Sequence, residues 1–297
     1  MPRITVTGAT GHLGTLVIEE LLRRGVPPQD LRATVRRVEK AAHWQEKGID
    51  VRPGDFNDPD ALKHAFAGTE RLLVISTDAV GQRIDQHRNA VMAAREAGVK
   101  HIAYTSLVDQ GAGESDSILA KEHRATEVIV RESGIPYTIL RNTFYAEYLL
   151  APVVQALDWG VCASSVGDAK MGGAARLDMA AAAAAVLIEP GHENKIYEIT
   201  YPRAWDYREA VEIVSRVSGR HLEYKPVSPE ELTQILQGAG VPAETARMIV
   251  GMEAPLRAGH LSKVTPDLER LLARPVTSLE QIARQMLAET QVQTPEP

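Results

Sequence analysis

Three glycines near the start of the chain are spaced for binding an anionic ligand. Gly8, Gly11 and Gly14 stand three residues apart, between the β-branched run ITVT and apolar residues at helical spacing. Gly8 can turn the chain off a strand, Gly11 leaves no Cβ between backbone and phosphate, and Gly14 allows the next helix to pack closely. The free N–H groups of that helix then favour an anion. The pattern predicts a dinucleotide-binding turn; the alternative is a tight loop without a ligand.

A pair of basic residues follows the second expected strand. In dinucleotide sites an acidic residue at this point takes the ribose hydroxyls, whereas a basic residue favours the 2′-phosphate of NADP. This chain has Arg36 and Arg37 there, with Lys40 as a possible second cation. Arg36 is the better candidate, because the last residue of a strand points towards the site while its neighbour points away. We therefore predict NADP, with NADPH preferred over NADH; the alternative is that both arginines only solvate a strand end.

The cysteine and the histidines give weaker signals. Cys162 is the only cysteine and has no CxxC companion, so we expect a buried apolar role and a reducing, cytoplasmic compartment. The nine histidines include no HExxH motif and no paired cluster. No metal site is predicted.

The elements that must position these residues alternate regularly through the first half of the chain. Short β-rich runs and helical patterns follow one another, which is typical of parallel βαβ units. We expect strands at residues 3–7, 31–36, 50–52, 71–76, 101–106 and 137–141, and helices at 13–24, 60–67, 83–97 and 119–133. Right-handed crossovers then predict an α/β fold with a Rossmann-type doubly wound parallel sheet of order 3-2-1-4-5-6.

The second half of the chain is less regular. A loop-rich stretch is expected at 151–175, and an alanine-rich helix and a strand are expected within 176–200. Further helices are expected at 207–217, 229–237 and 278–288, and the final QTPEP is expected to be disordered. We therefore predict an NAD(P)-binding Rossmann domain at 1–150 and a smaller α/β substrate-binding region at 151–297, of which 176–200 returns to the Rossmann sheet.

Composition limits the classes of partner. The chain has 297 residues, 44% of them hydrophobic and 24% charged, as expected for a soluble globular protein. The net charge of -6 gives no support to nucleic-acid binding. No apolar run approaches membrane-spanning length, and the first strand begins at once, so neither a membrane segment nor a signal peptide is expected.

Several segments beyond the glycine turn resemble the NmrA-like atypical short-chain dehydrogenase/reductases, and within them a bacterial quinone-reductase branch. GQRxxQHRN and LRNxxYxE are the most specific, and TGATGHLG, VRR, IAYTSL and LAKEHRATEVIVRESG agree with them. The resemblance covers most of the chain and weakens after about residue 205. It implies cofactor contacts along one edge of the sheet, at Gly8, Thr10, Gly11, His12, Leu13, Gly14 and Arg36, with adenine contacts at Asp55 and Phe56 and nicotinamide-side contacts at Ser76, Thr77, Gln82, Tyr104, Arg141, Asn142 and Phe144.

The resemblance also directs attention to His123. Ordinary short-chain dehydrogenases use Tyr-x-x-x-Lys, and none of the eight tyrosines here has lysine four residues on. Isoflavone-reductase-like relatives place a helix lysine where this chain has His123, and the quinone-reductase branch is similar to this chain in having histidine. His123, with Tyr104 as a second catalytic candidate, could protonate a reduced acceptor, since an unperturbed imidazole titrates near neutrality. The alternative is that His123 only packs or hydrogen-bonds beside the nicotinamide.

Two functions are implied by the resemblance. One is NADPH-dependent hydride transfer to a quinone or a similar electrophilic aromatic small molecule, for which holding the ring over the nicotinamide supplies on the order of 7 kcal/mol. The other is a redox sensor that binds the dinucleotide without turnover and reports to a protein partner. A reductase needs an acceptor cavity beside the nicotinamide, and a sensor does not.

Overall fold

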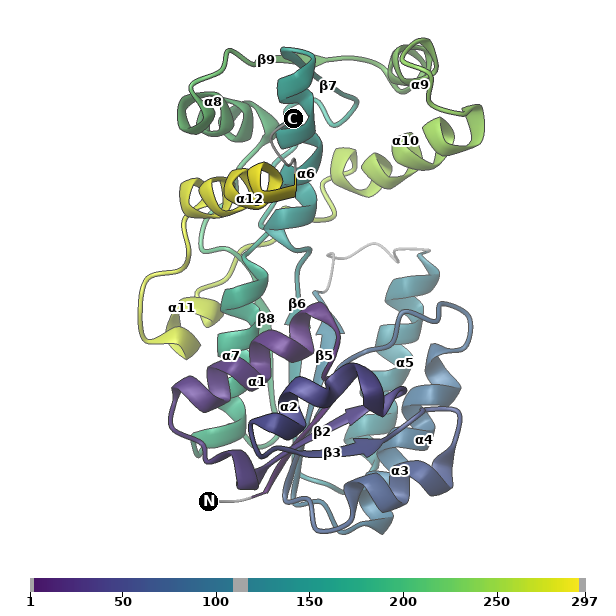
Figure 1. Cartoon of the computed structure of the whole chain (residues 1–297). Helices are drawn as coiled ribbons and strands as arrows, with labels where there is room; N and C mark the ends of the chain where they lie inside the picture. Colours follow the sequence, from purple (N-terminus) through teal and green to yellow (C-terminus); the bar gives the residue numbers. More distant parts are fainter. Residues whose placement is uncertain (1–2, 109–116, 294–297) are drawn as a thin grey trace.

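A single parallel sheet organises the first two thirds of the chain. The computed structural model describes residues 3–293 except 109–116. Seven strands form the sheet in the order β3-β2-β1-β4-β5-β6-β8 (Figure 1). The strands are β1 (Ile4–Thr7), β2 (Leu31–Val35), β3 (Asp50–Pro53), β4 (Arg71–Val74), β5 (His101–Leu107), β6 (Tyr137–Asn142) and β8 (Lys195–Ile199). The predicted order of the first six strands is confirmed, and β8 pairs in parallel with β6 at the edge.

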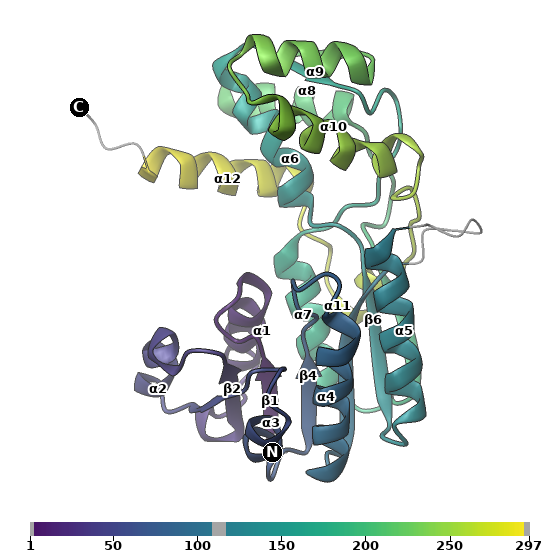
Figure 2. The ribbon, with the colours of Figure 1, turned by 90° about the vertical axis from the view of Figure 1, so that its right-hand side faces the viewer.

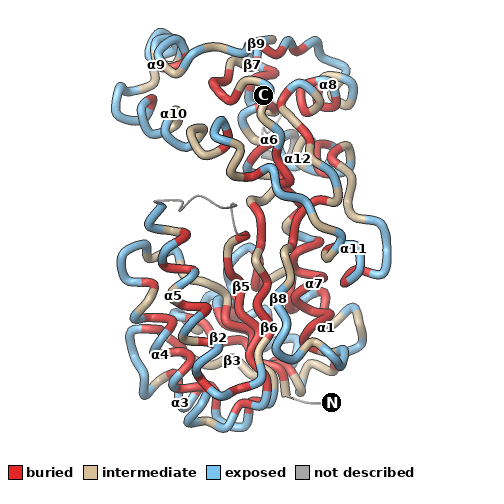
Figure 3. Tube along the Cα trace, turned by 180° about the vertical axis from the view of Figure 1, so that it is seen from behind, coloured by how far each residue is buried: buried red, intermediate tan, exposed pale blue. Residues whose placement is uncertain are grey.

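Helices cover both faces of the sheet. Figure 1 shows α1 (His12–Arg23) and α7 (Arg176–Ile188) on one side, with α3 (Pro59–Phe66), α4 (Arg83–Glu96) and α5 (Ile118–Glu132) on the other. The short α2 (Ala42–Glu46) and α11 (Asp267–Leu272) complete this part. The predicted helices 13–24, 60–67, 83–97 and 119–133 are confirmed to within one residue at each end. Because both faces are covered, the interior strands are buried along their length (Figure 3).

The alanine-rich helix α7 is the most enclosed helix of this part. Residues 178–187 are all buried, as α7 packs between α1 and strands β4, β5 and β6. A run of alanines suits this place, because alanine has the best helix propensity and leaves room for close approach on two sides.

A second group of elements lies above the C-terminal ends of the strands, which we call the carboxyl edge (Figure 2). It comprises α6 (Ala146–Gln155), β7 (Val161–Ser164), α8 (Tyr207–Ser218), β9 (Glu223–Pro226), α9 (Pro229–Gly238), α10 (Ala243–Arg257) and α12 (Leu279–Gln293). Strands β7 and β9 form a separate parallel pair. Since β6 leads directly into α6, the carboxyl edge faces this second group.

The prediction of a loop-rich stretch at 151–175 is partly wrong. Helix α6 continues through Pro152 to Gln155, and β7 follows at 161–164. Apolar residues at helical spacing, Leu149, Leu150 and Val153, are buried and hold the helix against α8 and α12. Tertiary packing thus outweighs the loss of one backbone hydrogen bond at the proline.

The C-terminal elements were only partly predicted. Helices α8 and α9 were predicted, whereas α10 and α11 were not. Helix α12 extends to Gln293, so of the final QTPEP only residues 294–297 lie outside the described part. Within the described residues, no helix is long and apolar enough to cross a membrane.

Candidate functional site

The glycine turn forms a backbone cradle at the carboxyl edge. Gly8 has φ +59°, in the left-handed region that glycine favours. A Cβ on Gly14 would lie 2.3 Å from the carbonyl oxygen of Gly8 and 2.9 Å from Cα of Ala9. Gly14 is therefore required by the backbone of the turn itself, and not only by helix–sheet packing.

The N-terminus of α1 is free to receive an anion. Gly11 is the N-cap residue, no side chain caps the helix, and no acidic residue stands in its first turn. The N–H groups of the first turn have no partner within the helix. Of the neighbouring candidates, Thr10 and His12 are exposed and Leu13 is buried. The cradle fits a diphosphate, with Thr10, Gly11 and His12 at its open side.

Adding one methyl group at Gly14 tests this cradle. Gly14→Ala is expected to weaken NADPH binding by about 5- to 150-fold, because the 2.3 Å contact forces the turn to move and such overpacking costs about 1–3 kcal/mol. Gly251→Ala is the matched control, since Gly251 lies within α10 and a Cβ there meets nothing within 4 Å. Fluorescence titration with NADPH measures both variants. An unchanged Kd in Gly14→Ala would contradict the cradle.

The cation expected at the end of β2 is available. Arg36 and Arg37 are both exposed, and neither forms an ion pair with any residue that the structure describes. Strand β2 ends at Val35, so Arg36 is the first residue after the strand and not its last residue as predicted. By contrast Arg32, within β2, is buried and bonded to Asp50 at 2.9 Å. The Arg36 guanidinium is therefore free to bind a 2′-phosphate, whereas the Arg32 guanidinium is not.

The adenine-side candidates differ from each other in exposure. Asp55 is half-buried and accepts hydrogen bonds from the backbone N–H and the side chain of Asn57. Phe56 is buried and meets His87 edge-on, at 6.2 Å between ring centroids. Phe56 therefore contributes mainly packing and backbone to this end of the site.

Unpaired polar atoms gather on the nicotinamide side. Within the described residues, Thr77 Oγ1, Asn142 Oδ1 and Thr143 Oγ1 are buried without a hydrogen-bond partner. Thr77 follows β4, Asn142 is the last residue of β6 and Thr143 follows it, all at the carboxyl edge. A buried unpaired oxygen costs about 1–3 kcal/mol. A polar ligand such as a carboxamide would satisfy them. Gln82 is exposed and Phe144 half-buried at the same edge, while the Ser76 N–H donates to Thr105 Oγ1 at 2.9 Å.

Arg141 is held by carboxylates of the protein itself. Its guanidinium donates two hydrogen bonds to Glu127, at 2.9 and 2.8 Å, and one to Glu198 at 3.0 Å. These bonds raise the pKa of Arg141. The positive charge of Arg141 is therefore compensated by carboxylates of the protein, whereas Arg36 has no such partner among the described residues.

His123 and Tyr104 are joined in a buried hydrogen-bonded pair. The Tyr104 hydroxyl lies 2.8 Å from Nδ1 of His123, and Tyr104 has no exposed surface. Burial raises the pKa of Tyr104, so its hydroxyl keeps its proton. Burial, with Arg83 nearby, lowers the pKa of His123 to about 3. Both groups are therefore neutral at physiological pH.

The surrounding hydrogen bonds assign the tautomer of His87. The Thr77 N–H donates to Nε2 of His87 at 3.1 Å, so the proton of His87 is on Nδ1, 3.0 Å from Thr126 Oγ1. For His123, the direction of the bond between Nδ1 and the Tyr104 hydroxyl depends on the tautomer of the ring. With Tyr104 as the donor, the proton of His123 is on Nε2, and His123 is a neutral hydrogen-bond donor.

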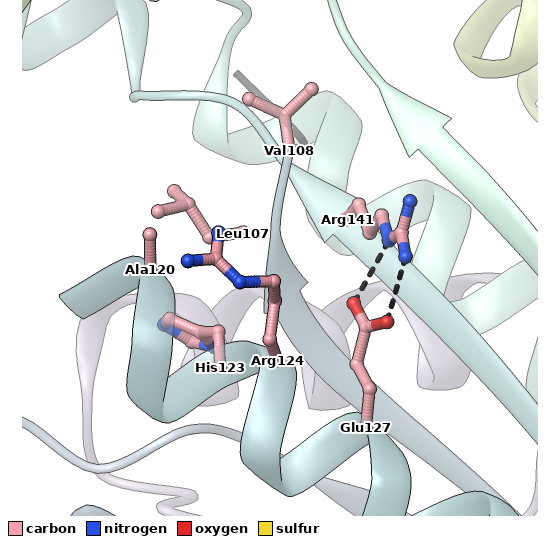
Figure 4. Close-up of a pocket in the computed structure, with 7 residues that line it drawn as sticks. All are labelled: Leu107, Val108, Ala120, His123, Arg124, Glu127 and Arg141. Atoms are coloured by element: carbon pink, nitrogen blue, oxygen red, sulfur yellow. Dashed lines mark hydrogen bonds and ion pairs between the residues drawn. The ribbon is translucent and has the colours of Figure 1, made fainter. Parts of the chain in front are cut away.

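A pocket adjoins His123 at the carboxyl ends of β5 and β6 (Figure 4). Its lining residues come from β5, α5 and β6 and the segment just after β5, and they are Leu107, Val108, Ala120, His123, Arg124, Glu127 and Arg141. No described residue is hydrogen-bonded to Nε2 of His123. The reductase hypothesis requires an acceptor cavity on this side. The pocket has room for about 20 Å³, so an aromatic acceptor would rest at its mouth rather than fill it.

Three functional candidates were missed by the sequence reasoning. Arg124 and Glu127 line the pocket, and their adjacency and i+4 spacing to His123 on α5 could have indicated this. Arg176 stacks on Tyr145 and Tyr148, with its Cζ 4.4 and 5.0 Å from the ring centroids. That contact joins the starts of α6 and α7, and no local sequence pattern indicated it.

Cys162 has the structural role that was predicted. It is buried, and burial raises the pKa of its thiol to about 12. It therefore remains an unreactive thiol near neutrality. Among the described residues, no group of three or more histidine, cysteine, aspartate or glutamate side chains is arranged to hold a metal ion.

Comparisons with known proteins show which family the chain belongs to. Quinone oxidoreductase 2 of Escherichia coli (strain K12) is 42% identical over 276 residues, covering 93% of this chain and 96% of that protein. The crystal structure of the NADPH-dependent quinone oxidoreductase of Escherichia coli, complexed with NADPH, has TM-score 0.86 at 40% identity, covering 96% of this chain and 99% of that chain. The triphenylmethane reductase of Citrobacter sp., complexed with NADP(H), has TM-score 0.87 at 41% identity, covering 95% and 99%. The NmrA-like family model matches residues 2–277, and the chain belongs to the NmrA-like family.

Proposed function

We propose that this chain is an NADPH-dependent reductase of quinones or similar electrophilic aromatic molecules. The observation that carries the proposal is the pocket lined by His123, at the same edge as the glycine cradle and Arg36. Residues 1–150 would hold the cofactor, and 151–297 would cover the acceptor side, with β8 completing the sheet. A small-molecule acceptor suits the pocket, and the net charge of -6 disfavours nucleic acid. The free thiol of Cys162 suits the reducing cytoplasm.

The residues that would hold the cofactor fall into three groups. The cradle at Gly8 to Gly14 would bind the diphosphate, and Arg36 the 2′-phosphate. The unpaired oxygens of Thr77 and Asn142 would bind the carboxamide end. Bound NADPH supplies a hydride, which leaves a quinone with one negatively charged oxygen that still needs a proton.

His123 would stabilise that oxygen as a neutral donor. His123 lines the pocket, and Tyr104 would hold the ring by donating to Nδ1, which leaves the proton on Nε2. The hypothesis that His123 protonates the acceptor relied on an unperturbed imidazole pKa. Burial lowers that pKa to about 3, so the imidazolium form is not populated near neutrality. A preorganised hydrogen bond to developing charge is the role that remains, and the proton then comes from water at the open pocket.

The second candidate function, a sensor without turnover, is separated from the reductase by one binding measurement. A reductase saturated with NADP+ has a second site, so a quinone should bind to that complex and form a dead-end ternary complex. Calorimetry of NADP+-saturated protein titrated with 1,4-naphthoquinone measures this binding. Saturable binding supports the reductase, whereas tight NADP+ binding with no quinone binding would favour the sensor.

The pH dependence of turnover provides a further test. We expect kcat to stay flat between about pH 8 and pH 6, because His123, with its pKa lowered to about 3, remains neutral throughout.

The free energy of unfolding should fall below about pH 6.5. In this range the histidines of the unfolded chain become protonated, whereas the buried histidines of the folded protein stay neutral. Burial lowers the pKa of His87 to about 3 and of His101 to about 4, so each contributes a loss of about 1.4 kcal/mol per pH unit on acidification.

These two pH effects are measured separately. Initial rates at saturating substrate report kcat, and urea denaturation at pH 7 and pH 5 reports the free energy of unfolding. A fall in kcat that titrates near pH 6.5 in fully folded protein would contradict the neutral donor.

A further inference from the structure

The small pocket beside His123 has an apolar part on which the edge of an aromatic ring can rest. Leu107 and Val108 at the end of β5, with Ala120 on α5, form its apolar part (Figure 4). His123 also lines the pocket, and its Nε2 has no hydrogen-bond partner among the described residues. An aromatic ring placed on these walls can therefore direct one oxygen towards His123.

The charges of the pocket do not cancel. Glu127 receives two hydrogen bonds from Arg141, at 2.9 and 2.8 Å, and a third from Ser106 at 2.7 Å. Its negative charge is therefore compensated within the protein. Arg124 is exposed and forms no ion pair with any described residue. One uncompensated positive charge thus remains among the residues that line the pocket.

The place of Arg124 in the pocket determines what it can contact. Figure 4 shows its side chain rising from α5 past His123 towards Leu107. A guanidinium binds carboxylate, sulfonate or phosphate oxygens through its paired N–H donors. The arrangement offers a hydrogen bond at one point of the pocket and an anion contact at another.

We propose that Arg124 makes this pocket selective for aromatic acceptors that carry an anionic substituent, such as a sulfonate or a carboxylate. The inference rests on the proposed reductase function, and it names the substrate class of the same site. The apolar walls hold the ring, His123 receives the reducible oxygen, and Arg124 binds the anionic group. Because Arg124 is exposed, the contribution is modest and sensitive to salt.

A matched series of acceptors tests the charge preference. Three 1,4-naphthoquinones carry a propyl side chain that ends in a sulfonate, a methyl or a trimethylammonium group, so that the charge changes while the ring potential stays nearly constant. We expect kcat/KM to be about two- to fivefold higher for the sulfonate than for the methyl compound, mainly through KM, and lowest for the cation. The ratio should shrink as salt is added.

Three variants assign the preference to Arg124. Arg124→Gln should bring the sulfonate-to-methyl ratio close to one, whereas Arg124→Lys should retain most of it. Arg131→Gln is the matched control, since Arg131 is an exposed arginine of the same helix that does not line the pocket, and it should keep the wild-type ratio. Equal kcat/KM values for the three acceptors in the wild type, or an unchanged ratio in Arg124→Gln, would overturn the proposal.

Failure of the reductase function is recognised separately. If the wild-type chain reduces none of the three quinones, the proposed function fails. Calorimetry with the same compounds and NADP+-saturated protein then tests the selectivity alone. Tighter binding of the sulfonate that is lost in Arg124→Gln supports the anion site, and equal or absent binding of all three compounds overturns it.

Discussion

His123→Asn is expected to lower kcat for quinone reduction about a hundredfold, the usual effect of removing one preorganised donor. The asparagine oxygen can still accept the hydrogen bond from Tyr104, but the side chain ends short of the Nε2 position. His123→Gln extends an amide N–H to about that position and is expected to keep kcat within about tenfold of the wild type. The pair therefore separates the donor at Nε2 from the contact at Nδ1, which the structure gives as 2.8 Å.

Two controls accompany this pair. The Kd for NADPH and the thermal unfolding midpoint should change similarly in both variants, since each removes a buried ring. If both variants lose stability alike and both keep kcat, His123 is a packing residue. If both lose kcat alike, the donor at Nε2 does not explain the loss.

Arg36→Gln is expected to raise KM for NADPH by about 10- to 100-fold, while KM for NADH changes little. Hydrogen bonds to a charged group contribute about 1.5–3 kcal/mol, and the 2′-phosphate is the only group by which the two cofactors differ. Arg36 is suited to this contact because it is exposed and forms no ion pair within the described residues. Steady-state kinetics with both cofactors at one ionic strength measure the change.

The neighbouring arginine supplies the control. Arg37→Gln removes the same charge one residue later, from a side chain that is equally exposed. A selective effect at Arg36 supports the direct contact. Equal losses in both variants would indicate a general field of positive charge, and parallel losses for NADPH and NADH would contradict 2′-phosphate recognition.

The parts of the fold that the sequence predicted are those set by local rules. Strand–glycine–helix alternation was sufficient for the order of the first six strands, because right-handed crossovers leave few topologies. The helix ends at Gly25 and Gly134 have φ 85° and 78°, as left-handed caps require. Helix α6 was obscured because Pro152 resembles a break, and only its packing against α8 and α12 shows why the helix continues.

The parts of the site that were not predictable depend on long-range burial and pairing. The resemblance implies a nicotinamide-side contact at Arg141, and the sequence does not show that Glu198, 57 residues further along the chain, compensates its charge. A histidine at position 123 suggests a general acid that titrates near neutral pH. Only the burial of His123 beside Tyr104 shows that its ring stays uncharged. The role proposed for Arg124 depends on the pocket that it shares with Leu107 and Val108, which lie at and just after the end of β5.

The central claim is tested most directly by anaerobic oxidation of NADPH by the purified protein, with and without 1,4-benzoquinone and with NADH in parallel. The account predicts oxidation that requires the quinone, prefers NADPH, forms one hydroquinone for each NADPH consumed, and falls sharply in His123→Asn. NADPH oxidation no faster than the uncatalysed reaction across several electrophilic acceptors, by protein that binds NADPH tightly, would contradict it.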